Sequence, residues 1–128
     1  MTIYALSSGS GISGIAVIRI SGPETREIIT KMTSGSFPKE KQATLKKINK
    51  IDTKEVIDQG IIIWFPGPQS YTGEDMAEFH VHGSRAVVEA IHTSISKIEN
   101  CRLAEPGEFT KLAFQNGKIN LLKAESIS

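Results

Sequence analysis

The sequence predicts an α+β domain with a mixed β-sheet and about three helices. Apolar runs typical of strands and amphipathic segments typical of helices follow one another in the order β-β-α-β-β-β-α-β-α. This order implies hairpins as well as strand–helix–strand connections, and therefore a mixed sheet. The chain has 128 residues, of which 39% are hydrophobic and 23% charged. These values are typical of one globular domain with its own core.

The N-terminal third predicts two strands and a helix. Thr2–Leu6 is a short apolar strand, and Ile15–Ile20 is apolar on both faces, which favours a central position in the sheet. A helix is expected next, with Ser21 as its N-cap and Glu24 at the reciprocal position of a capping box. Gly35 is expected to end this helix in a left-handed conformation.

The middle of the chain predicts three more strands. Ala43–Ile48 is rich in lysine, as expected of an edge strand protected by charge. Val56–Ile57 and Ile61–Phe65 are two pieces of strand with a break between them. Residues 66–73 contain two prolines and two glycines, which predict a loop. Asp75–His82 is the next predicted strand.

The C-terminal third predicts a long helix, a short strand and a short helix. Gly83 and Ser84 open an amphipathic helix that reaches Ile98. Arg102–Ala104 is a short strand. A second helix starts at residues 106–108 and ends at 116–117, where Asn-Gly favours a turn. Asn120 could cap one more helix, from Leu121 to the last residue of the sequence, Ser128.

Composition excludes several classes of protein. Fifteen basic and fourteen acidic residues leave a formal charge of +1, so a strongly electrostatic nucleic-acid or membrane-surface binder is not expected. The apolar runs are far shorter than the roughly 20 residues of a membrane span. The N-terminus carries no targeting signature. The lone Cys101 excludes an internal disulfide and a cysteine-based zinc site, and we expect a cytoplasmic protein.

The strand at 75–82 carries the densest group of functional side chains. Alternation places Glu78, His80 and His82 on one face. Three interpretations stay open: a metal site with these three ligands, a pocket in which Glu78 pairs with a guanidine-like edge, and a solvated strand face. Arg19 interrupts an apolar strand, so it is either an anion contact or a salt-bridge partner. Lys118 follows a turn and is typical of a solvated lysine.

Residues 9–14 are rich in glycine but do not form a phosphate-binding loop. No Gly-Lys-Ser/Thr follows them, and the next element is a strand rather than a helix whose N-terminus could meet a phosphate. A turn between two strands is the better interpretation.

Five segments resemble motifs of one family in the same order along the chain. They are residues 15–23 (IAVIRISGP), 65–75 (FPGPQSYTGED), 78–83 (EFHVHG), 104–118 (AEPGEFT and AFQNGK) and 120–125 (NLLKAE). The family that they resemble is MnmE/TrmE, also called ThdF, the tRNA modification GTPases. The likeness extends over almost the whole chain, and we identify the chain as similar to the N-terminal domain of that family.

The resemblance implies a fold, a ligand and an assembly. The fold would be related to the tetrahydrofolate-binding unit of glycine-cleavage aminomethyltransferases. Residues 1–118 would form a folate-binding and dimerisation domain, and residues 119–128 would start a helix leading into a helical domain. A homodimer would bind 5-formyltetrahydrofolate, or another tetrahydrofolate derivative, at its interface. The positions that match the folate-binding residues are Arg19, Glu78 and Lys118.

The resemblance also implies a larger protein. Its GTPase domain would use GTP, magnesium and potassium. With a flavin-dependent partner of the MnmG/GidA type, it would modify carbon 5 of the wobble uridine of tRNA. This chain contains no Walker motif, so we expect it not to be catalytic alone.

The sequence departs from the family pattern at three places. Residues 9–14 replace a Pro-Pro-Gly-Arg-Gly-Gly turn, His80 stands where glutamine is common, and Glu105 stands where arginine is common. The loss of two cations predicts weaker binding of an anionic ligand. Two alternatives therefore stay open: an assembly module that has lost folate binding, and a metal-binding domain using Glu78, His80 and His82.

Overall fold

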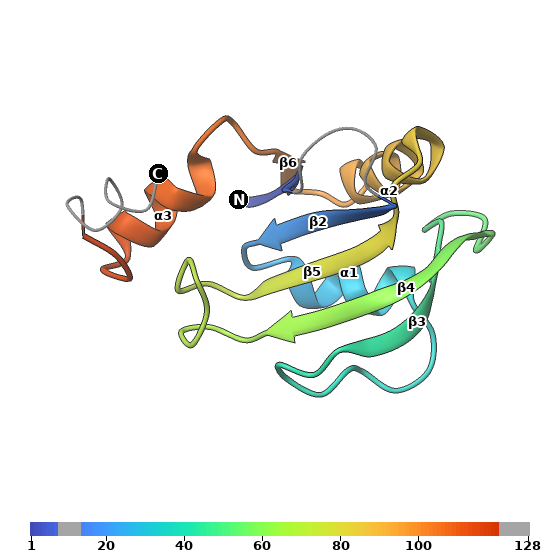
Figure 1. Ribbon diagram of the computed structural model, residues 1–128, viewed down its shortest axis with the longest axis horizontal. Helices are drawn as coiled ribbons and strands as arrows, with labels where there is room; N and C mark the ends of the chain where they lie inside the picture. The colour runs from blue at the N-terminus through green and yellow to red at the C-terminus, as the bar shows by residue number, and fades with distance from the viewer. Residues whose placement is uncertain (8–13, 121–128) are drawn as a thin grey trace.

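A computed structural model of the protein describes residues 1–7 and 14–120 (Figure 1). The described residues form an α+β fold with one six-stranded sheet and three helices, which confirms the predicted class and order of elements. The strands are β1 (Thr2–Leu6), β2 (Ile15–Ser21), β3 (Thr44–Asn49), β4 (Val56–Phe65), β5 (Met76–His82) and β6 (Cys101–Leu103). The helices are α1 (Thr25–Met32), α2 (Arg85–Ser96) and α3 (Glu108–Gln115).

The sheet is mixed, as predicted. Its strand order is β3-β4-β5-β2-β1-β6. All neighbouring strands pair antiparallel except β1 and β6, which are parallel. The apolar strand β2 lies inside the sheet between β5 and β1, and the lysine-rich β3 lies at an edge. Both positions agree with the sequence, because a strand apolar on both faces needs neighbours and an edge strand needs charge.

Two helices cover one face of the sheet. Figure 1 shows α1 behind the sheet, and the apolar residues of α1 and α2 join those of β2, β4 and β5 in a single core. This covered face presents alternate strand residues, as a period of two requires. The fully buried side chains of the core include Ile18, Ile20, Ile28, Ile29, Met32, Ile62, Phe79, Ile91 and Ile95.

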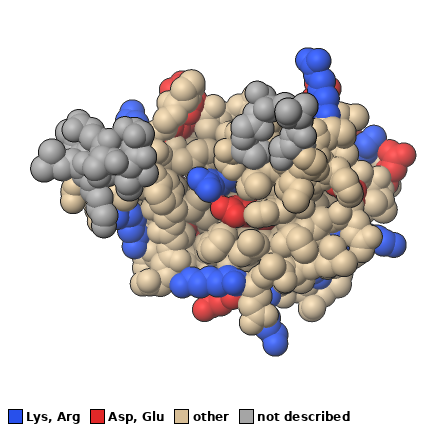
Figure 2. Space-filling view, in the orientation of Figure 1, with Lys and Arg blue, Asp and Glu red and all other residues tan. Residues whose placement is uncertain are grey.

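The opposite face of the sheet, which we call the open face, faces the viewer in Figures 1 and 2. The other set of alternate strand residues lies here, and apolar side chains remain exposed: Ile15 is 58% and Leu45 61% accessible to solvent. Figure 2 shows a largely uncharged surface with basic and acidic atoms side by side near its middle. An apolar face of this kind is typical of a binding surface.

The predicted capping box at the start of α1 is wrong. Ser21 is the last residue of β2, and its hydroxyl lies 2.8 Å from the hydroxyl of Thr72. The helix begins at Thr25, after Glu24. The carboxylate of Glu24 accepts hydrogen bonds from Thr2 Oγ1 at 2.8 Å and Asn100 Nδ2 at 2.5 Å. The Ser21 hydroxyl and the Glu24 carboxylate, which would form the capping box, thus bond to residues distant in sequence.

Two further local predictions need correction. The helix α1 ends before Thr33, which has an extended backbone, so Gly35 lies beyond its end although its φ is positive (84°). The strand β4 is continuous rather than broken at 58–60. Both neighbours make this possible: β3 pairs along this stretch, with Lys46 opposite Gly60, and the missing side chain of Gly60 lets the carbonyl of His80 approach.

The remaining predictions of helices, strands and loops agree with the structure to within two residues where it describes them. Ser84 caps α2 by accepting a hydrogen bond from the backbone of Val87 at 3.1 Å. Residues 66–73 form a loop between β4 and β5. The helix expected after Asn120 and most of the glycine-rich turn lie outside the described residues. Among residues 1–7 and 14–120, we find no helix with the length and apolar character needed to cross a membrane.

Candidate functional site

A cavity of about 330 Å³ opens on the open face of the sheet. Its lining residues come from three strands and from the loop between β4 and β5: Arg19, Phe65, Tyr71, Met76 and Glu78. The cavity thus combines an aromatic and apolar wall with one cation and one carboxylate. Cavities of this size and composition are typical of small-ligand sites.

Antiparallel pairing brings Arg19 and Glu78 together. The two residues lie directly opposite each other on β2 and β5, and Arg19 Nη2 donates to Glu78 Oε2 at 3.2 Å. Of the two interpretations that the sequence left open for Arg19, the structure shows the salt-bridge partner. The guanidinium also lies 5.9 Å from the ring centroid of Tyr71. Its Nε atom is buried and has no hydrogen-bond partner among the residues that the structure describes.

The second oxygen of Glu78 is also engaged. His80 lies two residues further along β5 on the same face, and its Nε2 is 2.9 Å from Glu78 Oε1. An ionised carboxylate can only accept hydrogen bonds. The imidazole therefore carries its hydrogen on Nε2 when it pairs with Glu78. One carboxylate at the cavity wall is held from both sides by donors.

Lys118 lies beside the loop that carries Tyr71. A Cβ atom placed on Gly73 would come within 3.2 Å of Lys118 Cε. The end of α3 is attached to the same loop, because Asn116 Nδ2 donates to the carbonyl of Thr72 at 2.7 Å. The structure thus joins Arg19 and Glu78 directly and places Lys118 against the loop at the edge of their cavity.

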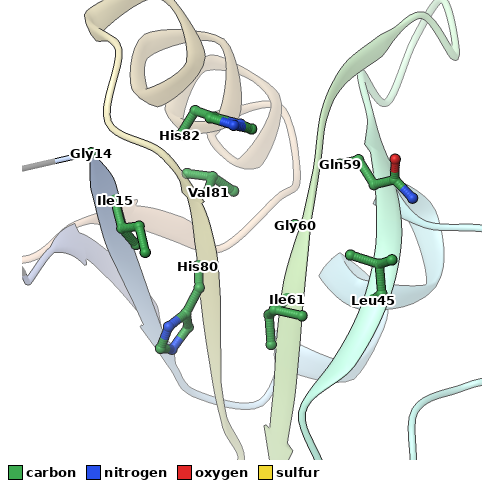
Figure 3. Close-up of a pocket in the computed structure, with 9 residues that line it drawn as sticks. All are labelled: Gly14, Ile15, Leu45, Gln59, Gly60, Ile61, His80, Val81 and His82. Carbon is green, nitrogen blue, oxygen red and sulfur yellow. The ribbon is translucent and has the colours of Figure 1, made fainter.

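The three residues proposed as metal ligands are not brought together. His82 turns to Asp58, whose oxygens lie 2.9 and 3.0 Å from its Nδ1. Figure 3 shows the rings of His80 and His82 well apart. In the described ranges, no group of three or more His, Cys, Asp or Glu residues could hold a metal ion. The metal interpretation therefore finds no support in residues 1–7 and 14–120.

The contact with His82 changes the pKa of the Asp58 carboxyl. Burial alone would raise the pKa of Asp58, but hydrogen bonds from His82 and from the backbone of Gln59 outweigh burial and lower it. Asp58 accepts from the backbone and the ring of His82, so this pair fixes the end of β5 against β4. The pair is a structural contact rather than half of a metal site.

A second cavity, of about 300 Å³, lies on the same face near the His82 end of β5 (Figure 3). Its wall is largely aliphatic, with Ile15, Leu45 and Ile61, and it also includes His80. Glu78 and His80 therefore line neighbouring hollows, one on each side of their hydrogen bond.

Sequence reasoning from the residues missed the aromatic and apolar wall of the first cavity. Tyr71 belongs to a loop, where no periodicity reports which way a side chain points. Phe65 and Met76 end one strand and begin the next, and they lie directly opposite each other. A signal was available in retrospect, because a hairpin that joins residues 65 and 76 must bring both beside the loop between them.

Cys101 does not take part in the site. Burial, helped by the carboxylates of Glu24 and Glu27, raises the pKa of its thiol to about 11. The thiol is therefore protonated at neutral pH, and a protonated thiol is a poor nucleophile.

The protein is an α+β domain with a small cavity on the open face of its sheet. The model of the family "GTP-binding protein TrmE N-terminus" matches residues 2–118. The chain belongs to this family. It is 71% identical over its whole length to the tRNA modification GTPase MnmE of Pelagibacter ubique, of which it covers 29%.

Two other relatives are less similar in sequence. The chain is 47% identical to the tRNA modification GTPase MnmE of Rhodopseudomonas palustris over 98% of its own length and 28% of that protein. It is also 47% identical to a mitochondrial tRNA modification GTPase of Dictyostelium discoideum, over 99% of the chain and 26% of that protein. The chain thus spans less than a third of the length of these relatives.

Proposed function

We propose that residues 1–118 are the folate-binding and dimerisation domain of a tRNA modification GTPase, with a tetrahydrofolate derivative such as 5-formyltetrahydrofolate bound in the Arg19–Glu78 cavity. The observation that carries this proposal is the carboxylate of Glu78 at the cavity wall. Each of its oxygens accepts one protein hydrogen bond and keeps a free lone pair. A pterin presents a guanidine-like edge with two N–H groups that such a carboxylate can meet.

The other residues of the cavity fit the remaining parts of this ligand. Tyr71 and Phe65 offer aromatic surface to a flat ring system. The volume of about 330 Å³ lies at the small end of the range for ligand sites, so the ring head would be enclosed and the glutamate tail would extend outward. Two cations could meet anionic groups of the tail: Arg19, whose Nε has no partner among the described residues, and Lys118, which lies beside the loop that carries Tyr71.

Dimerisation is supported by the open face of the sheet. Ile15 and Leu45 are exposed there beside the second cavity. In the fold of glycine-cleavage aminomethyltransferases, to which we propose this domain is related, two such units lie in one chain. Here a second copy would supply the other unit, and the folate would lie at the interface of the homodimer. Residues 119–128 would begin a helix leading into a helical domain.

The activity of a whole protein would require further domains. We propose a GTPase domain that uses GTP, magnesium and potassium, and a flavin-dependent partner of the MnmG/GidA type. Together they would modify carbon 5 of the wobble uridine of tRNA in the cytoplasm. The folate would supply a one-carbon unit. The near-neutral charge of this chain indicates that tRNA contacts belong mainly to other parts of such a protein.

Glu78→Gln is expected to weaken the binding of 5-formyltetrahydrofolate by about 10- to 100-fold. The amide removes the charge and replaces one acceptor oxygen by a donor, and hydrogen bonds to a charged group contribute about 1.5–3 kcal/mol. Isothermal titration calorimetry of both proteins measures the change. Glu89→Gln is the matched control, because Glu89 is an exposed carboxylate on α2 that pairs with Arg85. This control should bind as the unaltered protein does.

Three outcomes decide between the alternatives. Equal affinity in Glu78→Gln and in the unaltered protein would overturn the site assignment. A folded protein that takes up no folate but sediments as a dimer would favour the alternative, an assembly module without a ligand. A monomer that binds folate would contradict the interfacial placement of the site.

A further inference from the structure

The carboxylate of Glu78 is held by two donors of unequal quality. Arg19 supplies a single N–H to Oε2, at 3.2 Å, which is the long end of the range for such bonds. His80 supplies the shorter contact, 2.9 Å, to Oε1. A glutamate side chain has three rotatable bonds, and one long contact to one oxygen leaves rotation of the carboxylate group possible. The second contact removes that freedom.

The side chains opposite His80 on its neighbouring strands offer its imidazole no other hydrogen-bond partner. Val17 on β2 and Ile61 on β4 lie directly opposite it, and neither side chain has a hydrogen-bonding group. Among the described residues, the carboxylates that contact side chains of this face of β5 are Glu78, toward one end of the strand, and Asp58, at the His82 end. Since His82 and Asp58 are paired with each other, Glu78 is the carboxylate that His80 serves.

We propose that His80 is a positioning residue for ligand binding, which holds the carboxylate of Glu78 so that its free lone pairs face the Tyr71-lined cavity. This inference rests on the proposed folate site and adds a residue to it. His80 itself lines the neighbouring cavity (Figure 3) and acts through Glu78. The required property is a hydrogen-bond donor at the position of Nε2, which an imidazole or a glutamine amide can supply.

The test compares four variants with the unaltered protein by calorimetric titration with 5-formyltetrahydrofolate. His80→Leu keeps bulk and removes the donor, and we expect about tenfold weaker binding. His80→Gln restores a donor, and its affinity should return to within about threefold of the unaltered protein. His82→Leu is the matched control from the same face of β5, because its ring serves Asp58, and its affinity should stay unchanged. Thermal unfolding of each variant reports its folding, and His80→Ala provides a second donor-free side chain.

The outcomes separate this inference from the proposed function. Absence of folate binding in the unaltered protein would overturn the proposed function and the inference with it. Folate binding that is the same in His80→Leu, His80→Ala and the unaltered protein would overturn only the role of His80. Equal weakening in His80→Gln and His80→Leu, with both variants folded, would also overturn it, because donation would then not be the property that matters.

Discussion

Phe79→Ala is expected to lower the free energy of unfolding by about 3–5 kcal/mol. The side chain is fully buried at the centre of β5, on the face that α1 and α2 cover. Ile18 on β2 and Ile62 on β4 lie directly opposite it, so the ring has an apolar neighbour on each adjacent strand and the helices above it. Truncation removes apolar contact and leaves a cavity that rigid neighbouring strands cannot fill. Urea unfolding of both proteins measures the loss.

Phe114→Ala is the matched control for this prediction. Phe114 lies on α3 and is 49% exposed, so its loss should cost no more than about 1 kcal/mol. Equal losses in the two variants would mean that Phe79 does not lie in the core. Because Phe79 separates Glu78 from His80 in sequence, such a result would also contradict the placement of those two residues on the opposite, open face.

Gly22→Ala is expected to lower the free energy of unfolding by about 2–6 kcal/mol. Gly22 has φ 142°, a conformation that side chains rarely adopt, at a cost of about 1–3 kcal/mol. A Cβ atom there would also lie 2.4 Å from Thr2 Oγ1 and 2.5 Å from Thr2 Cα. Displacing a backbone to relieve overpacking costs about 1–3 kcal/mol more. The displaced strand is β1, which pairs with β2, the strand that carries Arg19.

Gly107→Ala separates the two costs. Gly107 also has a positive φ, 75°, but nothing lies within 4 Å of the Cβ that an alanine would add. It should therefore show only the conformational cost, of about 1–3 kcal/mol. Thermal or urea unfolding of the two variants gives the comparison. A loss in Gly22→Ala no larger than that in Gly107→Ala would contradict the close approach of Thr2 to Gly22.

Much of the fold follows from local patterns in the sequence. The alternation in residues 75–82 predicts which side chains of β5 face the core, and the structure buries Ala77, Phe79 and Val81. Lysine content identifies β3 as an edge strand, and Ser84 marks the start of α2. In each case the deciding interaction lies within one element or between immediate neighbours, which is what periodicity and capping rules describe.

Two of the failures involve partners distant in sequence. Glu24 pairs with Thr2 and Asn100 rather than capping its own helix. His82 pairs with Asp58 rather than joining a metal site, and that contact requires β4 and β5 to be neighbours in a particular register. Local patterns contain no information on such pairings.

The candidate site was predicted only in part, for the same reason. Glu78 and Arg19 could be chosen from their residue types and their places in strands, and resemblance to a family added Lys118 and the folate-binding role of all three. The direct contact of Arg19 with Glu78 depends on the register of β2 against β5. The aromatic wall depends on how the loop carrying Tyr71 folds over the sheet. Neither arrangement can be read from spacing along the chain.

The central claim is that a tetrahydrofolate derivative binds in the Arg19–Glu78 cavity on the open face. The most direct test is to titrate the isotope-labelled chain with 5-formyltetrahydrofolate and follow its backbone amide resonances by NMR. The largest shifts are expected at Arg19, Tyr71 and Glu78, with little change along α1, which lies behind the sheet (Figure 1). Shifts concentrated on the helix-covered face, or none at saturating ligand, would contradict the claim.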